Sequence, residues 1–201
     1  MPSLALAMIA FNEEQGLPLA VASVRSYVDE IVVGVDRRTT DGTREAVEGA
    51  TVFDLDFVDF AQMRNDVLAR VRSDWVLMLD ADEVLEGDPR PLLTRRRRPC
   101  IWEFPRRHWL DFDRTRPAPE DDWYPDRQAR LFPSDGSVRF ERPVHEVAEG
   151  LKKKRSFDHV IHHFKRAMRD DALIAERDRL YVALVERGLA AGHRFKKGKD
   201  Y

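Results

Sequence analysis

The stretch WVLMLDADE, residues 75–83, decides the fold of this chain. It starts with five apolar residues in succession, which is typical of a strand buried on both faces of a parallel sheet. It then ends abruptly in Asp80, Ala81, Asp82 and Glu83, so that two carboxylates one residue apart follow the strand directly. We expect a central strand that delivers acidic side chains to one edge of a sheet.

Three further strand-like runs precede this stretch, and helical patterns separate them. The runs cover residues 3–10, 30–35 and 51–54, and apolar residues recur at helical spacing in residues 17–28 and 59–71. Alternation of strand and helix predicts right-handed βαβ units and a mostly parallel sheet with helices on both faces. The expected fold class is therefore α/β and Rossmann-like.

Polar side chains stand where three of these strands end. Asn12 and Glu13 follow the first strand, Asp36 ends the second, and Asp80 and Asp82 follow the last. Ligands of such sheets bind at the carboxyl ends of the strands. The convergence of these side chains on one edge is the first indication of a functional site.

The second half of the chain has a different pattern. Short strands are expected at residues 101–104, 127–132, 138–140 and 159–164, with a polar loop over 111–125 and a final helix over 167–187. The arginine run 95–98 is a solvated face or a phosphate contact. We expect a smaller antiparallel part here, and one domain over residues 1–201.

Composition narrows the class of protein. The 201 residues are 35% charged, and the sequence predicts no transmembrane segment because no apolar run approaches the ~20 residues that span a bilayer. The one cysteine, Cys100, excludes an intrachain disulfide and suggests a cytoplasmic location. Residues 1–92 carry 8 basic and 18 acidic side chains, whereas residues 93–201 carry 26 and 18. An acidic half suits cations, and a basic half suits phosphates or an anionic acceptor such as DNA or a saccharide.

The Asp80–Asp82 pair indicates a metal site. Carboxylate oxygens are the ligands that Mg²⁺ and Mn²⁺ prefer, and such ions keep positions open for phosphate. A D-x-D triplet by itself is more often a solvated acidic turn. Its position after a buried strand, beside Asn12 and Asp36, favours the functional interpretation.

Four ordered blocks resemble family 2 glycosyltransferases, in pattern those of the lipopolysaccharide-core and sugar-peptide branch. They are AMIAFNEE at 7–14, VDRRTTDGT at 35–43, DFAQMRN at 59–65 and WVLMLDADE at 75–83. The resemblance implies a GT-A fold, with a nucleotide-sugar and metal half in 1–92 and an acceptor half in 93–201. The residues it assigns to the nucleotide sugar are Phe11, Asn12, Glu13, Asp36, Arg64, Asp80, Ala81 and Arg130.

Some of these roles are more specific. Asp36 contacts the base, and Arg64 faces the diphosphate or fixes the acidic loop. Asp80 reaches the ribose or a metal-bound water, and Asp82 ligates the metal. The family commonly has a small residue after Val-Asp, where this chain has Arg37 and Arg38, so the base stays undetermined.

The resemblance extends more thinly over residues 127–164. Arg130-Leu131-Phe132 and Val144-His145-Glu146 match a block in which Glu146 is the general base; the alternative is a salt bridge of Glu146 with Arg130 or Arg142. Competing bases are Asp121 and Asp122. His162 completes the metal site, with His163 on the opposite face, and the acceptor side comprises Trp109, Trp123 and His145.

The resemblance thus implies a metal-dependent, inverting glycosyltransferase that uses Mn²⁺ or Mg²⁺ and a nucleotide diphosphate-sugar, with UDP-sugar favoured. The acceptor hydroxyl belongs to a saccharide, a protein or a modified DNA base. One alternative is a nucleotidyltransferase, against which the Asn-Glu-Glu after the first strand counts. Another is a nucleotide-sugar or metal-binding module without turnover. The chain has neither a G-x-x-x-x-G-K-[ST] nor a G-x-G-x-x-G motif.

Overall fold

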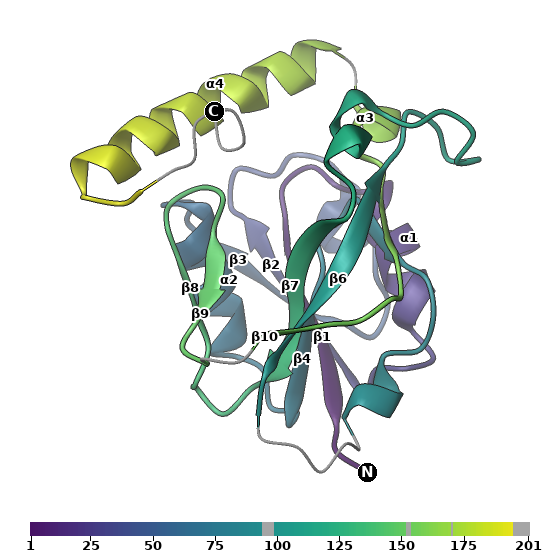
Figure 1. Cartoon of the computed structure of the whole chain (residues 1–201). Helices are drawn as coiled ribbons and strands as arrows, with labels where there is room; N and C mark the ends of the chain where they lie inside the picture. The colour runs from purple at the N-terminus through teal and green to yellow at the C-terminus, as the bar shows by residue number, and fades with distance from the viewer. Residues whose placement is uncertain (94–98, 152–153, 170, 195–201) are drawn as a thin grey trace.

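The computed structural model describes residues 1–93, 99–151, 154–169 and 171–194 (Figure 1). The arginine run 95–98 lies outside these residues. The elements in chain order are β1 (Leu4–Ala10), α1 (Gly16–Val24), β2 (Glu30–Asp36), β3 (Thr51–Leu55), α2 (Phe60–Leu68), β4 (Trp75–Met78), β5 (Glu83–Leu85), β6 (Ile101–His108), β7 (Asp126–Pro133), β8 (Arg139–Glu141), β9 (Val147–Glu149), β10 (Lys154–Ser156), β11 (Ile161–His163), α3 (Lys165–Met168) and α4 (Asp171–Ala190). Single 3₁₀ turns occur at Gly42–Arg44, Arg90–Leu92 and Pro119–Trp123.

One twisted sheet continues through both halves of the chain in the order β3-β2-β1-β4-β7-β6-β11-β5, with β10 beside β6. The first four strands are parallel, as the sequence predicts. β7 pairs antiparallel with both β4 and β6, and β8 and β9 form a separate antiparallel pair. The α/β fold class with a smaller antiparallel part is confirmed.

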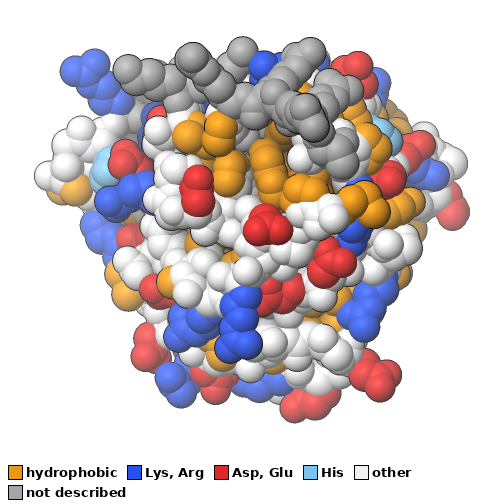
Figure 2. Space-filling view, turned by 90° about the horizontal axis from the view of Figure 1, so that it is seen from below, with side chains coloured by type: hydrophobic (Ala, Val, Ile, Leu, Met, Phe, Trp, Pro, Cys, Tyr) orange, Lys and Arg blue, Asp and Glu red, His pale blue; other side chains and the backbone are white. Residues whose placement is uncertain are grey.

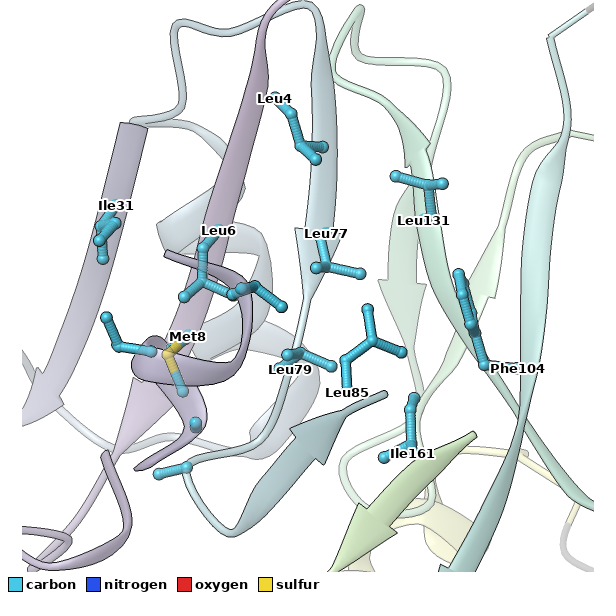
Figure 3. Packing of buried hydrophobic residues seen from close by; sticks show 14 of the residues in the cluster. Leu4, Leu6, Met8, Ile31, Leu77, Leu79, Leu85, Phe104, Leu131 and Ile161 are labelled. Atoms are coloured by element: carbon cyan, nitrogen blue, oxygen red, sulfur yellow. The ribbon is translucent and has the colours of Figure 1, made fainter. Parts of the chain in front are cut away.

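Two hydrophobic layers cover the two faces of this sheet. Leu4, Leu6 and Met8 point to one face, where α1 packs and where the layer continues to Phe104 and Ile161 (Figure 3). Ala7 and Val32 point to the other face, which α2 covers. Because both faces are covered, β1 is apolar along its whole length rather than alternating.

Local chemistry sets where the helices begin. The Asp59 carboxylate accepts a hydrogen bond from the backbone N–H of Gln62 and so caps α2. Gly34 of β2 lets α2 approach closely, because a Cβ there would lie 2.6 Å from a methyl of Val67. Between β2 and β3 the chain forms a 3₁₀ turn, Gly42–Arg44.

The parallel strands all end at the upper edge of the sheet in Figure 1, and α4 lies across that edge. Leu184 and Val185 of α4 pack there on Val144. On the face seen from below in Figure 2, acidic and basic side chains lie interspersed around hydrophobic ones. No helix among the described residues is long and apolar enough to cross a bilayer.

Candidate active site

A cavity of about 1080 Å³ lies at this edge, between the strand ends and α4. It is lined by both halves of the chain. Of the residues predicted from the sequence, those in its wall are Phe11, Asn12, Glu13, Asp36, Arg64, Asp80, Ala81, Asp82, Trp109, Trp123, Arg130, His145 and Glu146. Asp121, Asp122 and His162 do not line it.

Asp82 and His163 form the centre of the acidic wall. Oδ1 of Asp82 lies 3.3 Å from Nε2 of His163; the Asp82 side chain is buried and that of His163 is partly buried. The register of β11 sets this contact, because it pairs His163 with His108 of β6 on one side and with Glu83 of β5 on the other. Burial alone raises the pKa of Asp82, but His163 and Arg169 outweigh it and hold that pKa well below its ordinary value.

A chain of hydrogen bonds supports His163 from behind. Its Nδ1 lies 2.9 Å from Nδ1 of His108, whose Nε2 lies 3.2 Å from Oδ2 of Asp126. Burial lowers the pKa of His108 and so favours the neutral ring. With the proton of His108 on Nε2 for Asp126, its Nδ1 accepts from Nδ1 of His163, and Nε2 of His163 faces Asp82.

This arrangement fits a divalent cation. A carboxylate oxygen and an imidazole lone pair that face each other at 3.3 Å repel unless a cation or a proton lies between them. The described residues hold no group of three or more His, Cys, Asp or Glu side chains that could bind a metal. Mg²⁺ in particular is commonly held by one or two carboxylates together with substrate phosphates and water. Asp82 and His163 would thus supply the protein ligands, and a substrate the others.

The structure reverses the predicted roles of the two histidines. His162 lies on the other side of β11, where its Nδ1 accepts from the indole N–H of Trp109 at 3.0 Å and its Nε2 lies 2.7 Å from a carboxylate oxygen of Glu86. The structure therefore places His163, and not the predicted His162, beside Asp82. Neighbouring side chains of a strand point to opposite faces, so the phase of β11 decides which histidine faces Asp82.

Two arginines from the C-terminal segment neutralise the acidic wall. Nη1 of Arg169 lies 2.6 Å from Oδ2 of Asp82, and its Nη2 bonds Glu13. Nη1 of Arg177, on α4, lies 3.6 Å from Glu13. Even so, burial and the charge of Asp82 raise the pKa of Glu13 to about 7, because they outweigh both arginines.

Asp80 is held by arginines rather than pointing toward Asp82. Its Oδ1 accepts from Arg64 at 2.6 Å and its Oδ2 from Arg130 at 2.7 Å. Burial would raise the pKa of Asp80, but Arg130 and Arg64 together hold it far below its ordinary value. Each oxygen of Asp80 thus already accepts from an arginine, and the sharing of a cation between Asp80 and Asp82 stays a prediction.

Arg64 and Arg130 therefore fix the acidic loop. Arg64 donates from Nε to Glu146 at 2.6 Å as well as to Asp80, and Arg130 also bonds Glu83. For Arg64 this is the second of its two predicted roles. The salt bridge considered for Glu146 exists, but with Arg64 rather than with Arg130 or Arg142.

The loop that bears Ala81 packs tightly on the start of α1. A Cβ on Gly16 would lie 2.6 Å from the carbonyl oxygen of Ala81, so only glycine fits there. Asn12, at φ 53°, accepts through Oδ1 from the backbone N–H of Thr40. These contacts join the ends of β1, β2 and β4 into one wall.

On the opposite wall, the competing bases point away from the cavity. Asp121 accepts from Arg107 at 2.8 Å and from the backbone N–H of His108, and Asp122 is not part of the lining. Glu120 lines the cavity instead and is paired with Arg166. The predictions of Asp121 and Asp122 as bases thus lack the required placement.

The residues predicted for the acceptor side do lie on the cavity. Trp123 is half exposed there, Trp109 is anchored by His162, and His145 packs edge-on against Tyr181 of α4 with ring centroids 5.9 Å apart. Sequence reasoning missed His108, Asp126, Arg169 and Arg177. No local pattern marks these four residues, because their contacts depend on the pairing of β6 with β7 and on the path of the C-terminal segment.

The chain is similar to known proteins in sequence and in fold. Residues 6–95 match the model of Glycosyl transferase family 2. A TPR repeat-containing protein of Synechococcus elongatus is 34% identical over 154 residues, which are 74% of this chain and 36% of that protein. An uncharacterized glycosyltransferase of Rickettsia typhi is 32% identical over 90 residues, which are 44% of this chain and 30% of that protein. The chain spans about a third of the length of these curated relatives.

Among solved structures, S. aureus TarS 1-349 has the same fold. It aligns with a TM-score of 0.57 at 13% identity, over 81% of this chain and 60% of that chain. The family match covers β1 to β5, the part of the sheet that carries Glu13, Asp36 and Asp82. Over residues 6–95 the chain is thus similar to glycosyl transferase family 2, and its architecture is the GT-A fold.

Proposed function

We propose that this chain is the catalytic domain of a metal-dependent, inverting glycosyltransferase that takes a sugar from a nucleotide diphosphate-sugar. The observation that carries the proposal is the pairing of Asp82 with His163 in the wall of the cavity. The same cavity is lined by Asp36 at the end of β2 and by Glu146 from the second half. S. aureus TarS, which shares the fold, has been crystallised with UDP, and this supports a nucleotide as ligand.

Asp82 and His163 would hold Mn²⁺ or Mg²⁺. When bound, the cation supplies Lewis-acid neutralisation of charge on the departing diphosphate. Arg169 and Arg177 lie on the same carboxylates and bring positive charge to the same place. A diphosphate that approaches Asp82 therefore meets a site whose acidic groups are already balanced by cations.

Glu146 is the base in this proposal. Its Oε1 is fixed by Arg64, and its Oε2 has no hydrogen-bond partner among the described residues. In the transfer, the acceptor oxygen attacks the anomeric carbon while the bond from that carbon to the phosphate oxygen breaks. Oε2 of Glu146 takes the hydroxyl proton. Attack opposite to the leaving group inverts the anomeric centre.

Aromatic side chains on the far side of the cavity suit a sugar-bearing acceptor. Trp123 offers an exposed indole face, on which a saccharide ring can stack, and Trp109 and His145 lie in the same wall. The sheet that joins both halves supports treating residues 1–201 as one domain.

A thermal-shift panel tests the proposal. UDP-, GDP-, TDP- and CDP-sugars are added to the wild type and to Asp82→Asn, each with Mn²⁺ and with chelator. We expect at least one donor to stabilise the wild type with Mn²⁺, and the stabilisation to vanish in chelator or in Asp82→Asn. If no donor stabilises the wild type under any condition, the proposal is wrong.

A further inference from the structure

Two adjacent arginines follow β2, at the place where the family commonly has a small residue, and they face different surroundings. Arg37 donates to Asp56 at 2.8 Å and does not line the cavity. Arg38 lines the cavity and bonds Asp36. The side chains of both arginines are 59% exposed. A substitution of Arg37 is thus a matched control for one of Arg38.

The contact between Arg38 and Asp36 uses one edge of the guanidinium. Nε donates to Oδ1 at 3.0 Å and Nη2 to Oδ2 at 2.6 Å, and the backbone N–H of Arg38 also donates to Oδ1. The side chain of Asp36 is 2% exposed. Asp36 therefore lies beneath Arg38, with both carboxylate oxygens engaged, and a ligand in the cavity meets the arginine first.

Two aromatic rings flank the guanidinium. Its Cζ lies 5.3 Å from the ring centroid of Phe11 and 5.0 Å from that of Phe57, and both rings line the cavity. Stacking on aromatic faces and a two-point bond to a carboxylate both hold a guanidinium in a fixed plane. Nη1 has no hydrogen-bond partner among the described residues. The outer edge of the guanidinium therefore keeps N–H donors for a ligand in the cavity, which Arg38 lines.

We infer that Arg38 reads the base of the donor nucleotide, and that Asp36 acts as a positioning residue that holds Arg38 rather than as the reader. This inference rests on the proposed function and names the class of donor. The free end of the fork presents only N–H donors. It matches a base with a carbonyl oxygen at the corresponding edge: O6 and N7 of guanine, or O4 of uracil and thymine.

The same donors disfavour the amino bases. Adenine and cytosine carry an exocyclic amino group where guanine, uracil and thymine carry the oxygen, so donors would face donors. An amino base therefore loses the hydrogen bond that an oxo base makes with Arg38. We therefore expect nucleotides of oxo bases to bind in preference to those of amino bases.

Calorimetric titration of GDP, UDP, CDP and ADP with Mn²⁺ tests this inference in four proteins: wild type, Arg38→Ala, Arg38→Lys and Arg37→Ala. The wild type should bind GDP or UDP at least about tenfold tighter than ADP and CDP, which is the usual discrimination of a two-point arginine contact. Arg38→Ala should abolish this preference, because it weakens the binding of only the oxo-base nucleotides. Arg38→Lys keeps the charge but not the fork, and should lose the preference too. Arg37→Ala should behave as the wild type.

Asp36→Asn tests whether Asp36 only positions Arg38. It should reduce the preference for oxo-base nucleotides, but less than Arg38→Ala does. If Arg38→Ala binds UDP more tightly than the wild type, Arg38 only covers Asp36 and the inference is wrong. It is equally wrong if Arg38→Ala keeps the wild-type preference. If the wild type binds no nucleotide of any base, the proposed function itself fails and the inference falls with it.

Discussion

Arg169 places Nη1 2.6 Å from Oδ2 of Asp82, so a guanidinium occupies part of the site at which we propose that a metal binds. The side chains of both residues are buried. Because Arg169 also bonds Glu13, it is the main counter-charge of this acidic wall. A divalent cation and Arg169 therefore compete for the same carboxylate.

Arg169→Ala should raise the affinity for Mn²⁺ in the absence of nucleotide. Loss of the competing charge-assisted hydrogen bond corresponds to about tenfold. Arg187→Ala is the matched control, because Arg187 lies on the C-terminal helix α4 and bonds Asp59 rather than Asp82. Mn²⁺ titrations followed by electron paramagnetic resonance measure both variants. Equal affinities for the two would contradict the competition.

Glu83→Gln should be strongly destabilising. Glu83 is 0% exposed, and its Oε1 accepts from Arg130 at 2.6 Å and from Arg106 at 3.0 Å. Removal of one charge from a buried ion-pair network costs about 3–5 kcal/mol, because the remaining charges are left uncompensated. Glu86→Gln, at a side chain 64% exposed, should cost at most about 1 kcal/mol. Urea unfolding compares them, and similar losses in both would argue against the network.

Much of the fold is predictable from sequence, because β1, β2 and β4 are apolar runs that end in polar residues. The order of the strands in the second half is not. β7 and β6 pair across the long loop, and this pairing puts Arg106 opposite Asp126. No local pattern gives such a pairing, since it depends on which edge of the sheet the returning chain meets.

The first half of the site was more predictable than the second. Asp82 follows from the end of a strand, but the choice between His162 and His163 depends on the phase of the three-residue strand β11, and the register with β5 and β6 sets that phase. Arg169 reaches Asp82 across 87 residues of sequence. Contacts of this kind come from the path of the C-terminal segment, which composition and periodicity do not specify.

Glu13 makes stability depend on pH. The folded state raises its pKa from 4.5 to about 7, mainly through burial. Between these values the folded protein binds a proton that the unfolded chain has released, so the contribution of Glu13 to stability falls as pH rises. Burial lowers the pKa values of His108 and His162, so these histidines make stability rise with pH. Their effect is the same in the wild type and in a variant of Glu13.

Glu13→Gln removes this contribution. Thermal midpoints in chelator at pH 5, 6, 7 and 8 should show the variant gaining on the wild type as pH rises, with most of the change below about pH 8. The difference between the two proteins isolates the Glu13 carboxyl from the histidines. A constant difference over this range would mean that Glu13 keeps an ordinary pKa.

Glu146→Gln should strongly lower turnover without weakening the binding of the donor. Loss of a general base lowers turnover by about 10²–10⁴-fold, while a glutamine can still accept from Arg64. Glu149→Gln, at an exposed end of the adjacent β9, is the control. Turnover and nucleotide affinity are measured for both on whichever donor stabilises the wild type. Near-normal turnover of Glu146→Gln would assign the base elsewhere.

The central claim is that Asp82 and His163 hold the cation that a donor diphosphate shares. The most direct test is titration of the nucleotide diphosphate that binds the wild type, with and without Mn²⁺, into His163→Ala and His162→Ala. We predict that His163→Ala loses the dependence of affinity on Mn²⁺, and that His162→Ala, altered one residue away on the opposite face of β11, keeps it. The opposite pattern, or full dependence on Mn²⁺ in His163→Ala, would contradict the account.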